Sequence, residues 1–182
     1  MQPPDGAGRE REQHRESKTM TSTIEQRLAE LGLSLPVPWS LPPGTLTGSL
    51  LVRAHAGRIF VGGHVPLDSQ GQVCGPFGKV GAEVSLEQAQ EAARLTLLAI
   101  LASLKVQIGS LDRIEAWLRV GGFVNTAPSF VDYPRVMNAA SRLITEIFGE
   151  ASGSHARLAI GVAGLPWGVP VEMEAEVSLA GQ

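Results

Sequence analysis

The spacing of apolar residues predicts two long helices, over residues 85–108 and 134–148. A capping box begins the first helix, where Ser85 is followed three residues later by Gln88, and Gly109 is expected to end it. A proline suits the first turn of the second helix, and Gly149 is expected to close it. The apolar stripes consist of Ala89, Ala92, Ala93, Leu97, Ile100, Leu101, Leu104 and Ile108 in the first helix, and Val136, Met137, Ala140, Leu143, Ile144, Ile147 and Phe148 in the second.

Alternation of apolar and polar residues predicts strands with one buried face. Residues 114–120 alternate in this way, and Gly121-Gly122 is expected to kink or bulge that strand. Residues 169–179 also alternate, and their polar face carries several carboxylates. These are Glu172, Glu174 and Glu176. A face with several carboxylates suits water or a polar subunit boundary better than a core.

Turn residues arrange the remaining strands into two expected hairpins. Residues 50–53 and 59–61 are β-like runs separated by Ala56 and Gly57. Residues 157–163 lead through a Leu-Pro turn into residues 169–179, which we interpret as a second hairpin at the end of the chain. The expected order is therefore hairpin, helix, strand, helix, hairpin.

This order predicts an α+β fold in which two long helices pack on one face of a four- or five-stranded mixed sheet. Helices of this length cannot cover both faces, so the other face is expected to be solvated or buried in an oligomer. Three segments are expected: a disordered charged tail over residues 1–19, a helix and proline-rich linker over 20–44, and the main domain over 45–182.

Composition narrows the function classes. The chain has 182 residues, 43% of them hydrophobic, and a formal net charge of −3, which argues against nucleic acid or an anionic membrane as partner. No apolar run is long enough to span a bilayer. A lone cysteine, Cys74, excludes an internal disulfide and is typical of a cytoplasmic protein. The four histidines lack metal-site spacing, so no metal is expected. They are His14, His55, His64 and His155.

Arg157 is the first candidate for chemistry, because it begins a strand of small and apolar residues that leave it few solvated neighbours. A guanidinium in such surroundings needs a carboxylate partner or a carboxylate ligand. Two interpretations stay open: a ligand site, or a structural ion pair with Glu172, Glu174 or a neighbouring subunit. The spacing along the last strand does not choose a catalytic residue among its three glutamates.

An ordered set of motifs over about residues 45–180 resembles the RidA/YjgF family of reactive-intermediate deaminases, which share a chorismate-mutase-like fold. The motifs are Phe60-Val61-Gly62-Gly63-His64-Val65-Pro66, Gln90, Asn138, Ala156-Arg157, Leu165-Pro166 and Val171-Glu172-Met173-Glu174. The short first helix and the loop from Gly75 to Gly81 resemble a longer, less studied branch. The resemblance implies a homotrimer with a central barrel of sheets and ligand clefts between neighbouring subunits.

The resemblance also implies roles for single residues. Arg157 matches the arginine that holds the carboxylate of a 2-imino or 2-enamino acid, and Glu172 matches the glutamate that orients or activates the attacking water. Gly63 and Ala159 match backbone positions that contact the ligand, and Asn138 matches an asparagine near the cleft. A buried amide that ties a helix to a loop is the alternative for Asn138.

The chain departs from the family pattern at two positions. His64 stands where the family has glutamine, and Ser49 stands where it has a tyrosine. His64 is therefore expected to shape the substrate pocket, and both changes alter the lining of the cleft. His155, in a loop with glycine and serine, is expected to be a surface histidine.

The resemblance implies cofactor-free hydrolysis of a 2-imino or 2-enamino acid to a 2-keto acid and ammonia. One alternative is a non-catalytic ligand-binding or protein-interaction module of the same fold. Another is an RNA-cleaving or translation-inhibiting protein, which the acidic balance and the lack of a basic stripe argue against. The expected partners are a small 2-imino or 2-keto acid and further copies of the chain, with no nucleic acid and no membrane.

Overall fold

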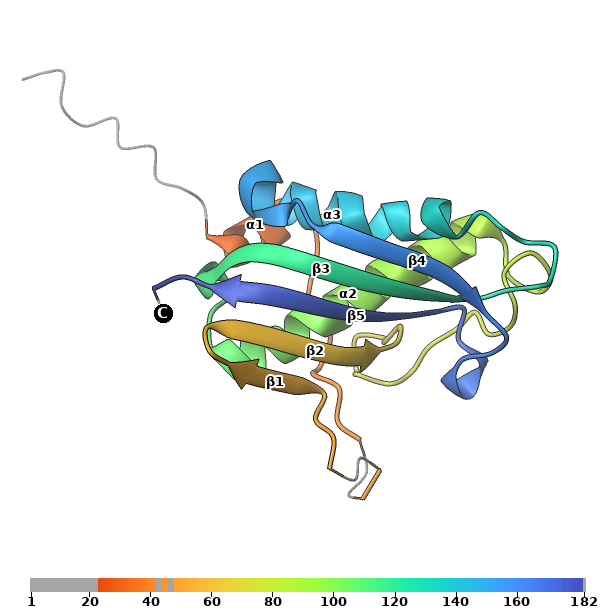
Figure 1. The fold of residues 1–182 in the computed structure, drawn as a ribbon, viewed down its shortest axis with the longest axis horizontal. Coiled ribbons are helices and arrows are strands. Elements are labelled where there is room, and N and C mark those ends of the chain that lie inside the picture. The colour runs from red at the N-terminus through yellow and green to blue at the C-terminus, as the bar shows by residue number, and fades with distance from the viewer. Residues whose placement is uncertain (1–22, 42–43, 46–47, 182) are drawn as a thin grey trace, which may run out of the picture.

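A mixed five-stranded sheet with helices on one face organises the computed structural model, which describes residues 23–41, 44–45 and 48–181 (Figure 1). The strands lie in the order β1-β2-β5-β3-β4. Their bounds are β1 Val52–His55, β2 Arg58–His64, β3 Ile114–Asn125, β4 Ala156–Val162 and β5 Val171–Leu179. The helices are α1 Ile24–Glu30, α2 Leu86–Ile108 and α3 Tyr133–Gly153, with short 3₁₀ turns at Leu111–Arg113 and Pro166–Gly168. The expected α+β architecture is confirmed.

The last two strands do not form the hairpin that the sequence predicted. β4 pairs only with β3, in parallel, whereas β5 lies between β2 and β3 and is antiparallel to both. The reason is the crossover through α3, since a parallel neighbour needs a helix-length connection. This crossover places β4 at the outer edge of the sheet and leaves the other side of β3 for β5. The first hairpin, β1 with β2, is confirmed.

The two long helices form where their apolar stripes predicted them. Ser85 and Gln88 make the reciprocal capping-box bonds at the start of α2, and Gly109 follows its end with φ 82°. In α3 the predicted end at Gly149 is a break with φ 73°, after which the chain turns once more and reaches Gly153. The buried side chains of both helices pack against the sheet in one hydrophobic core.

The predicted kink at Gly121-Gly122 is wrong. β3 runs straight through both glycines, and its register shifts relative to β5 lie earlier, between residues 114 and 119. The glycines instead make room on the two faces of the sheet. A Cβ at Gly121 would lie 2.6 Å from Cγ of Glu174, and one at Gly122 would lie 2.4 Å from Sδ of Met137.

The short helix α1 packs against α3 and begins with a second capping box, formed by Thr23 and Gln26. It leads into the proline-rich segment. The charged tail over residues 1–19 lies outside the described residues. In the part of the chain that the structure describes, no helix has the length and apolar content that crossing a membrane requires.

His64 lies at the end of β2 with its side chain fully buried. Its Nδ1 lies 2.9 Å from the carbonyl oxygen of Gly62, and its Nε2 lies 2.8 Å from Oγ of Ser103. Because a carbonyl only accepts, Nδ1 carries the proton and Nε2 accepts from the serine hydroxyl. Trp39 packs edge-on against the imidazole. Burial lowers the pKa of His64 from its ordinary 6.5.

This buried imidazole predicts a loss of stability in weak acid. Below pH 6.5 the imidazole of His64 is protonated in the unfolded chain but stays neutral in the folded chain. The free energy of unfolding therefore falls as the pH drops from about 7 towards the lowered pKa. Urea denaturation between pH 7.5 and 5 should show a smaller slope in His64→Gln than in the wild type. His55→Gln, at an exposed position of β1, serves as the control. Equal slopes for His64→Gln and the wild type would contradict this assignment.

Candidate functional site

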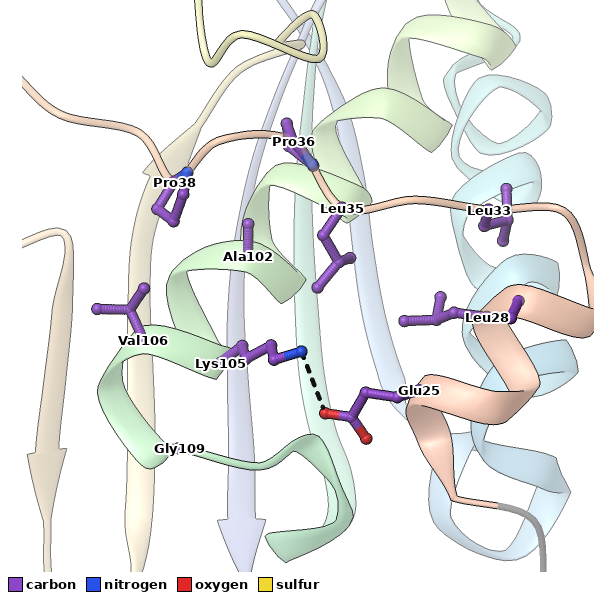
Figure 2. Close-up of a pocket in the computed structure, with 11 residues that line it drawn as sticks. Glu25, Leu28, Leu33, Leu35, Pro36, Pro38, Ala102, Lys105, Val106 and Gly109 are labelled. Atoms are coloured by element: carbon purple, nitrogen blue, oxygen red, sulfur yellow. Dashed lines mark ion pairs between the residues drawn. The ribbon is translucent and has the colours of Figure 1, made fainter.

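A large hollow lies away from every candidate residue. It measures about 610 Å³ and separates α1 and the segment after it from the end of α2 (Figure 2). Its lining is mostly apolar, and an ion pair between Glu25 and Lys105 crosses it at 3.5 Å. Because its one lining cation already has a carboxylate partner, this hollow offers no free cation for an acidic ligand.

A second, polar hollow of about 440 Å³ lies where β4 begins, beside α3. Hydroxyl groups, an imidazole and the guanidinium of Arg157 line it, and no carboxylate does. Its lining residues are Ser141, Thr145, Ser154, His155 and Arg157. A hollow lined by donors and a cation suits a small anion, so its chemistry makes it the candidate site although it is the smaller of the two.

Hydrogen bonds from α3 hold the Arg157 guanidinium. Its Nη1 donates to Oδ1 of Asn138 at 2.9 Å and to Oγ of Ser141 at 3.1 Å. Partial burial lowers the pKa of Arg157, but a guanidinium stays charged at neutral pH. Among the described residues no carboxylate forms an ion pair with Arg157, including the two glutamates that the sequence left as alternatives. The arginine therefore carries a charge that no carboxylate of the described residues neutralises.

The three glutamates of β5 differ in their partners. Glu174 forms an ion pair with Arg119 at 3.3 Å, and Glu176 forms one with Arg58. Glu172 has neither an ion pair nor a hydrogen bond from any described residue, and burial raises the pKa of its carboxyl. Structure thus separates three residues that alternation alone made equivalent, and Glu172 is the one left available.

The absence of a side chain at Gly63 allows the Glu172 carboxylate to lie against β2. The pairing of β2 with β5 shifts register between Val61 and His64, which brings the Gly63 backbone against this side chain. A Cβ at Gly63 would lie 1.9 Å from Oε1 of Glu172. Glycine is therefore required for the carboxylate to lie against β2.

Arg157 and Glu172 lie on opposite faces of the sheet. Arg157 is level with Val120 of β3, whose side chain is buried under the helices, and the arginine accordingly reaches α3. Glu172 is level with Phe123, three residues further along β3 and so on the other face. One chain therefore cannot bring these two side chains to the same small ligand.

Of the other expected site residues, two lie near Arg157, one lies near Glu172, and His64 lies near neither. Asn138 binds Arg157, and Ala159, two residues along β4, points to the same face and packs against the core. Gly63 belongs with Glu172. The His64 side chain is in the core, where both ring nitrogens are occupied, so it lines neither described hollow.

Two residues of the site were missed by sequence reasoning. Ser141 bonds Arg157, and Ser141 in turn contacts His155, which the sequence led us to expect as an ordinary surface histidine. Their spacing carried a signal: Ser141 follows Asn138 by three residues, which places both on one face of α3. His155 precedes Arg157 by two residues.

Comparison with known proteins agrees with this architecture. Residues 42–171 match the model of the YjgF/chorismate-mutase-like endoribonuclease family. The chain belongs to this family. Protein TCP17 of Trypanosoma cruzi is 34% identical over 163 residues, which cover 90% of this chain and 98% of TCP17.

Solved structures show the same likeness. Atu1372 of Agrobacterium tumefaciens is 36% identical with a TM-score of 0.76, covering 86% of this chain and 92% of its own. A candidate endoribonuclease of Shewanella oneidensis is 29% identical with a TM-score of 0.78, covering 86% and 99%. TdcF of Escherichia coli, solved with bound serine, shares the fold at 19% identity and a TM-score of 0.55, covering 81% and 96%.

The contact between Gly63 and Glu172 predicts a change in the titration of that carboxyl. A methyl group in Gly63→Ala takes the place of Oε1, so the flexible carboxylate swings outward into water while the fold is kept. The pKa of Glu172 should then fall back towards 4.5. Carbon-detected NMR titration of the glutamate carboxyls measures it.

Gly62→Ala is the matched control, since its Cβ meets Leu50 at an ordinary 3.4 Å and should leave the titration unchanged. An unaltered Glu172 curve in Gly63→Ala would show that the carboxyl does not depend on this contact.

Proposed function

We propose that the protein binds a small 2-imino or 2-enamino acid and hydrolyses it, without a cofactor, to the 2-keto acid and ammonia. The observation that carries this proposal is the Arg157 guanidinium, which faces a polar hollow and has no carboxylate partner among the described residues. The family membership supports it at the level of the fold.

The geometry of Arg157 favours a carboxylate ligand. Nη1 has two hydrogens, and its bonds to Asn138 and Ser141 occupy them. Within the described part of the chain, Nε and Nη2 donate to no acceptor, so the edge they form is available. A guanidinium edge matches the two oxygens of a carboxylate, and such a paired contact fixes the adjacent carbon in place. That carbon is the C=N carbon of a 2-imino acid.

Glu172 supplies the second requirement of the reaction, a base for water. Water adds its oxygen to the C=N carbon while the carboxylate takes one proton from it and passes that proton to the nitrogen, which gives a carbinolamine. The hydroxyl of the carbinolamine then gives its proton to the nitrogen as the C=O bond forms, and the C–N bond breaks to release ammonia. Because burial raises the pKa of Glu172, its carboxylate is a better proton acceptor than an ordinary surface glutamate. No basic side chain of the described residues pairs with Glu172, which leaves its carboxylate available for this role.

The separation of the two residues by the sheet requires a second chain. We propose that the chain forms a homotrimer in which Arg157 of one protomer and Glu172 of its neighbour line a shared cleft. The face that carries Glu172 is free of helices and exposes large apolar side chains. These are Phe60 at 41%, Leu158 at 41% and Ile160 at 37%. Exposed apolar area of this kind is typical of a contact surface.

The alternatives make different demands on these residues. A non-catalytic binding module needs Arg157 but not a free carboxylate with a raised pKa, so the state of Glu172 favours hydrolysis. RNA cleavage is disfavoured because the net charge of the chain is −3, whereas binding to a phosphate backbone relies on an excess of basic residues.

Single substitutions should separate binding from turnover. With freshly generated 2-iminobutyrate and ammonia release as the assay, Glu172→Gln should keep KM and lower kcat about 10²-fold, the usual size of a lost general base. Glu174→Gln, two residues along the same face but ion-paired with Arg119, is the matched control and should stay near the wild-type rate. If Glu172→Gln is as fast as this control, Glu172 does not activate the water.

The contact between Arg157 and the ligand carboxylate can be tested separately. Arg157→Lys keeps the charge but cannot make the paired contact, so the dissociation constant for 2-oxobutyrate should rise about tenfold or more. Isothermal titration calorimetry measures it. Equal affinity in the wild type and Arg157→Lys would remove Arg157 from the site.

Mixing subunits tests the shared cleft. Trimers assembled from equal amounts of Arg157→Ala and Glu172→Gln chains should regain activity in about a quarter of their clefts. A cleft is intact only when its Arg157 comes from a Glu172→Gln chain and its Glu172 comes from an Arg157→Ala chain. Each variant alone should stay at its own low residual rate. Mixed trimers without activity, from variants that assemble normally, would show that the two residues do not work together across a boundary.

A further inference from the structure

A chain of hydrogen bonds runs from the loop before β4 to the Arg157 guanidinium. Nδ1 of His155 lies 2.7 Å from the carbonyl oxygen of Gly153, and Nε2 lies 3.0 Å from Oγ of Ser141. Oγ of Ser141 in turn lies 3.1 Å from Nη1 of Arg157. None of the roles derived above uses His155, which is partly buried in this arrangement.

The chain has a single direction when the imidazole is neutral. The carbonyl of Gly153 can only accept, so Nδ1 of His155 carries the proton and Nε2 is an acceptor. The hydroxyl hydrogen of Ser141 is then given to Nε2. This leaves the lone pairs of its Oγ to receive a hydrogen from Arg157. Along this chain each hydrogen-bond donor therefore meets an acceptor in the next group.

Asn138 completes the grip on the guanidinium. It lies three residues before Ser141 on the same face of α3, so Oδ1 of Asn138 and Oγ of Ser141 each accept one hydrogen of Nη1. An arginine side chain loses much rotational freedom when it binds a ligand, and holding it beforehand removes part of that loss. With Nη1 held, the Nε and Nη2 edge keeps one orientation towards the hollow.

We propose that His155 and Ser141 are positioning residues for Arg157: His155 orients the Ser141 hydroxyl, and the hydroxyl fixes the guanidinium for a carboxylate. The consequence for ligand affinity rests on the proposed function, whereas the immobilised guanidinium is a property of the free protein. The two parts can therefore be measured separately.

The first measurement needs no ligand. Nitrogen-15 NMR of arginine side chains in the full-length protein reports rotation of the Arg157 guanidinium about its Nε–Cζ bond. Rotation should be at least about threefold faster in His155→Phe, which breaks one hydrogen bond of the chain, and in Ser141→Ala, which breaks two. His55→Phe, at an exposed position of β1, is the matched control and should not change it. Unchanged rotation in both variants would overturn the proposal.

The second measurement asks whether the two residues act as one chain. Each single variant should weaken 2-oxobutyrate binding about three- to tenfold, the equivalent of one hydrogen bond. The double variant should be no weaker than Ser141→Ala alone, because His155 acts only through Ser141. Multiplied effects in the double variant would show that His155 acts independently and would overturn the proposal.

The outcomes separate this proposal from the proposed function. A wild-type protein that fails to bind 2-oxobutyrate, yet shows slow guanidinium rotation that both variants release, refutes the ligand and retains the positioning chain. A protein that binds 2-oxobutyrate with equal affinity and rotation in all variants refutes the chain and retains the ligand. Circular dichroism confirms that each variant is folded.

Discussion

The pairings of β3 with β4 and with β5 determine the rest of the site, because they decide which face of the sheet Arg157 and Glu172 reach. Arg157 lies level with a buried valine and turns towards α3, whereas Glu172 lies level with Phe123 and turns away. A shift of one residue in either pairing would move one of the two side chains to the other face and place both on the same face. The large hydrophobic core under the helices holds the register, so the separation of the two charged groups is a property of the fold.

The separation of Arg157 and Glu172 bears on the sheet face that the described helices leave uncovered. Helices cover one face only, and a chain of this kind leaves apolar side chains of β2 and β4 exposed on the other. In the proposed trimer, association of this face with the β4 edge of a neighbour would bury them and bring the Glu172 carboxylate of one protomer towards the Arg157 guanidinium of another. The opposite charges, each without an ion-pair partner among the described residues of its own chain, are complementary across such a boundary.

Much of this architecture was readable from the sequence, since the helix stripes, caps and alternating strands depend on local pattern. The position of β4 was not, because a turn with proline and glycine fits a hairpin and a longer connection equally well. Glycine was likewise ambiguous: Gly121 and Gly122 suggested a bulge but serve to admit Glu174 and Met137. The choice of Glu172 over its neighbours and the partnership of His155 with Ser141 required three-dimensional contacts.

The most direct test is a crystal structure of the full-length protein with 2-oxobutyrate. The account predicts the carboxylate within hydrogen-bond distance of Nε and Nη2 of Arg157, with Glu172 of a neighbouring protomer beside the carbonyl carbon. A ligand bound instead in the apolar hollow near Lys105, or a cleft in which no neighbouring Glu172 approaches Arg157, would contradict it.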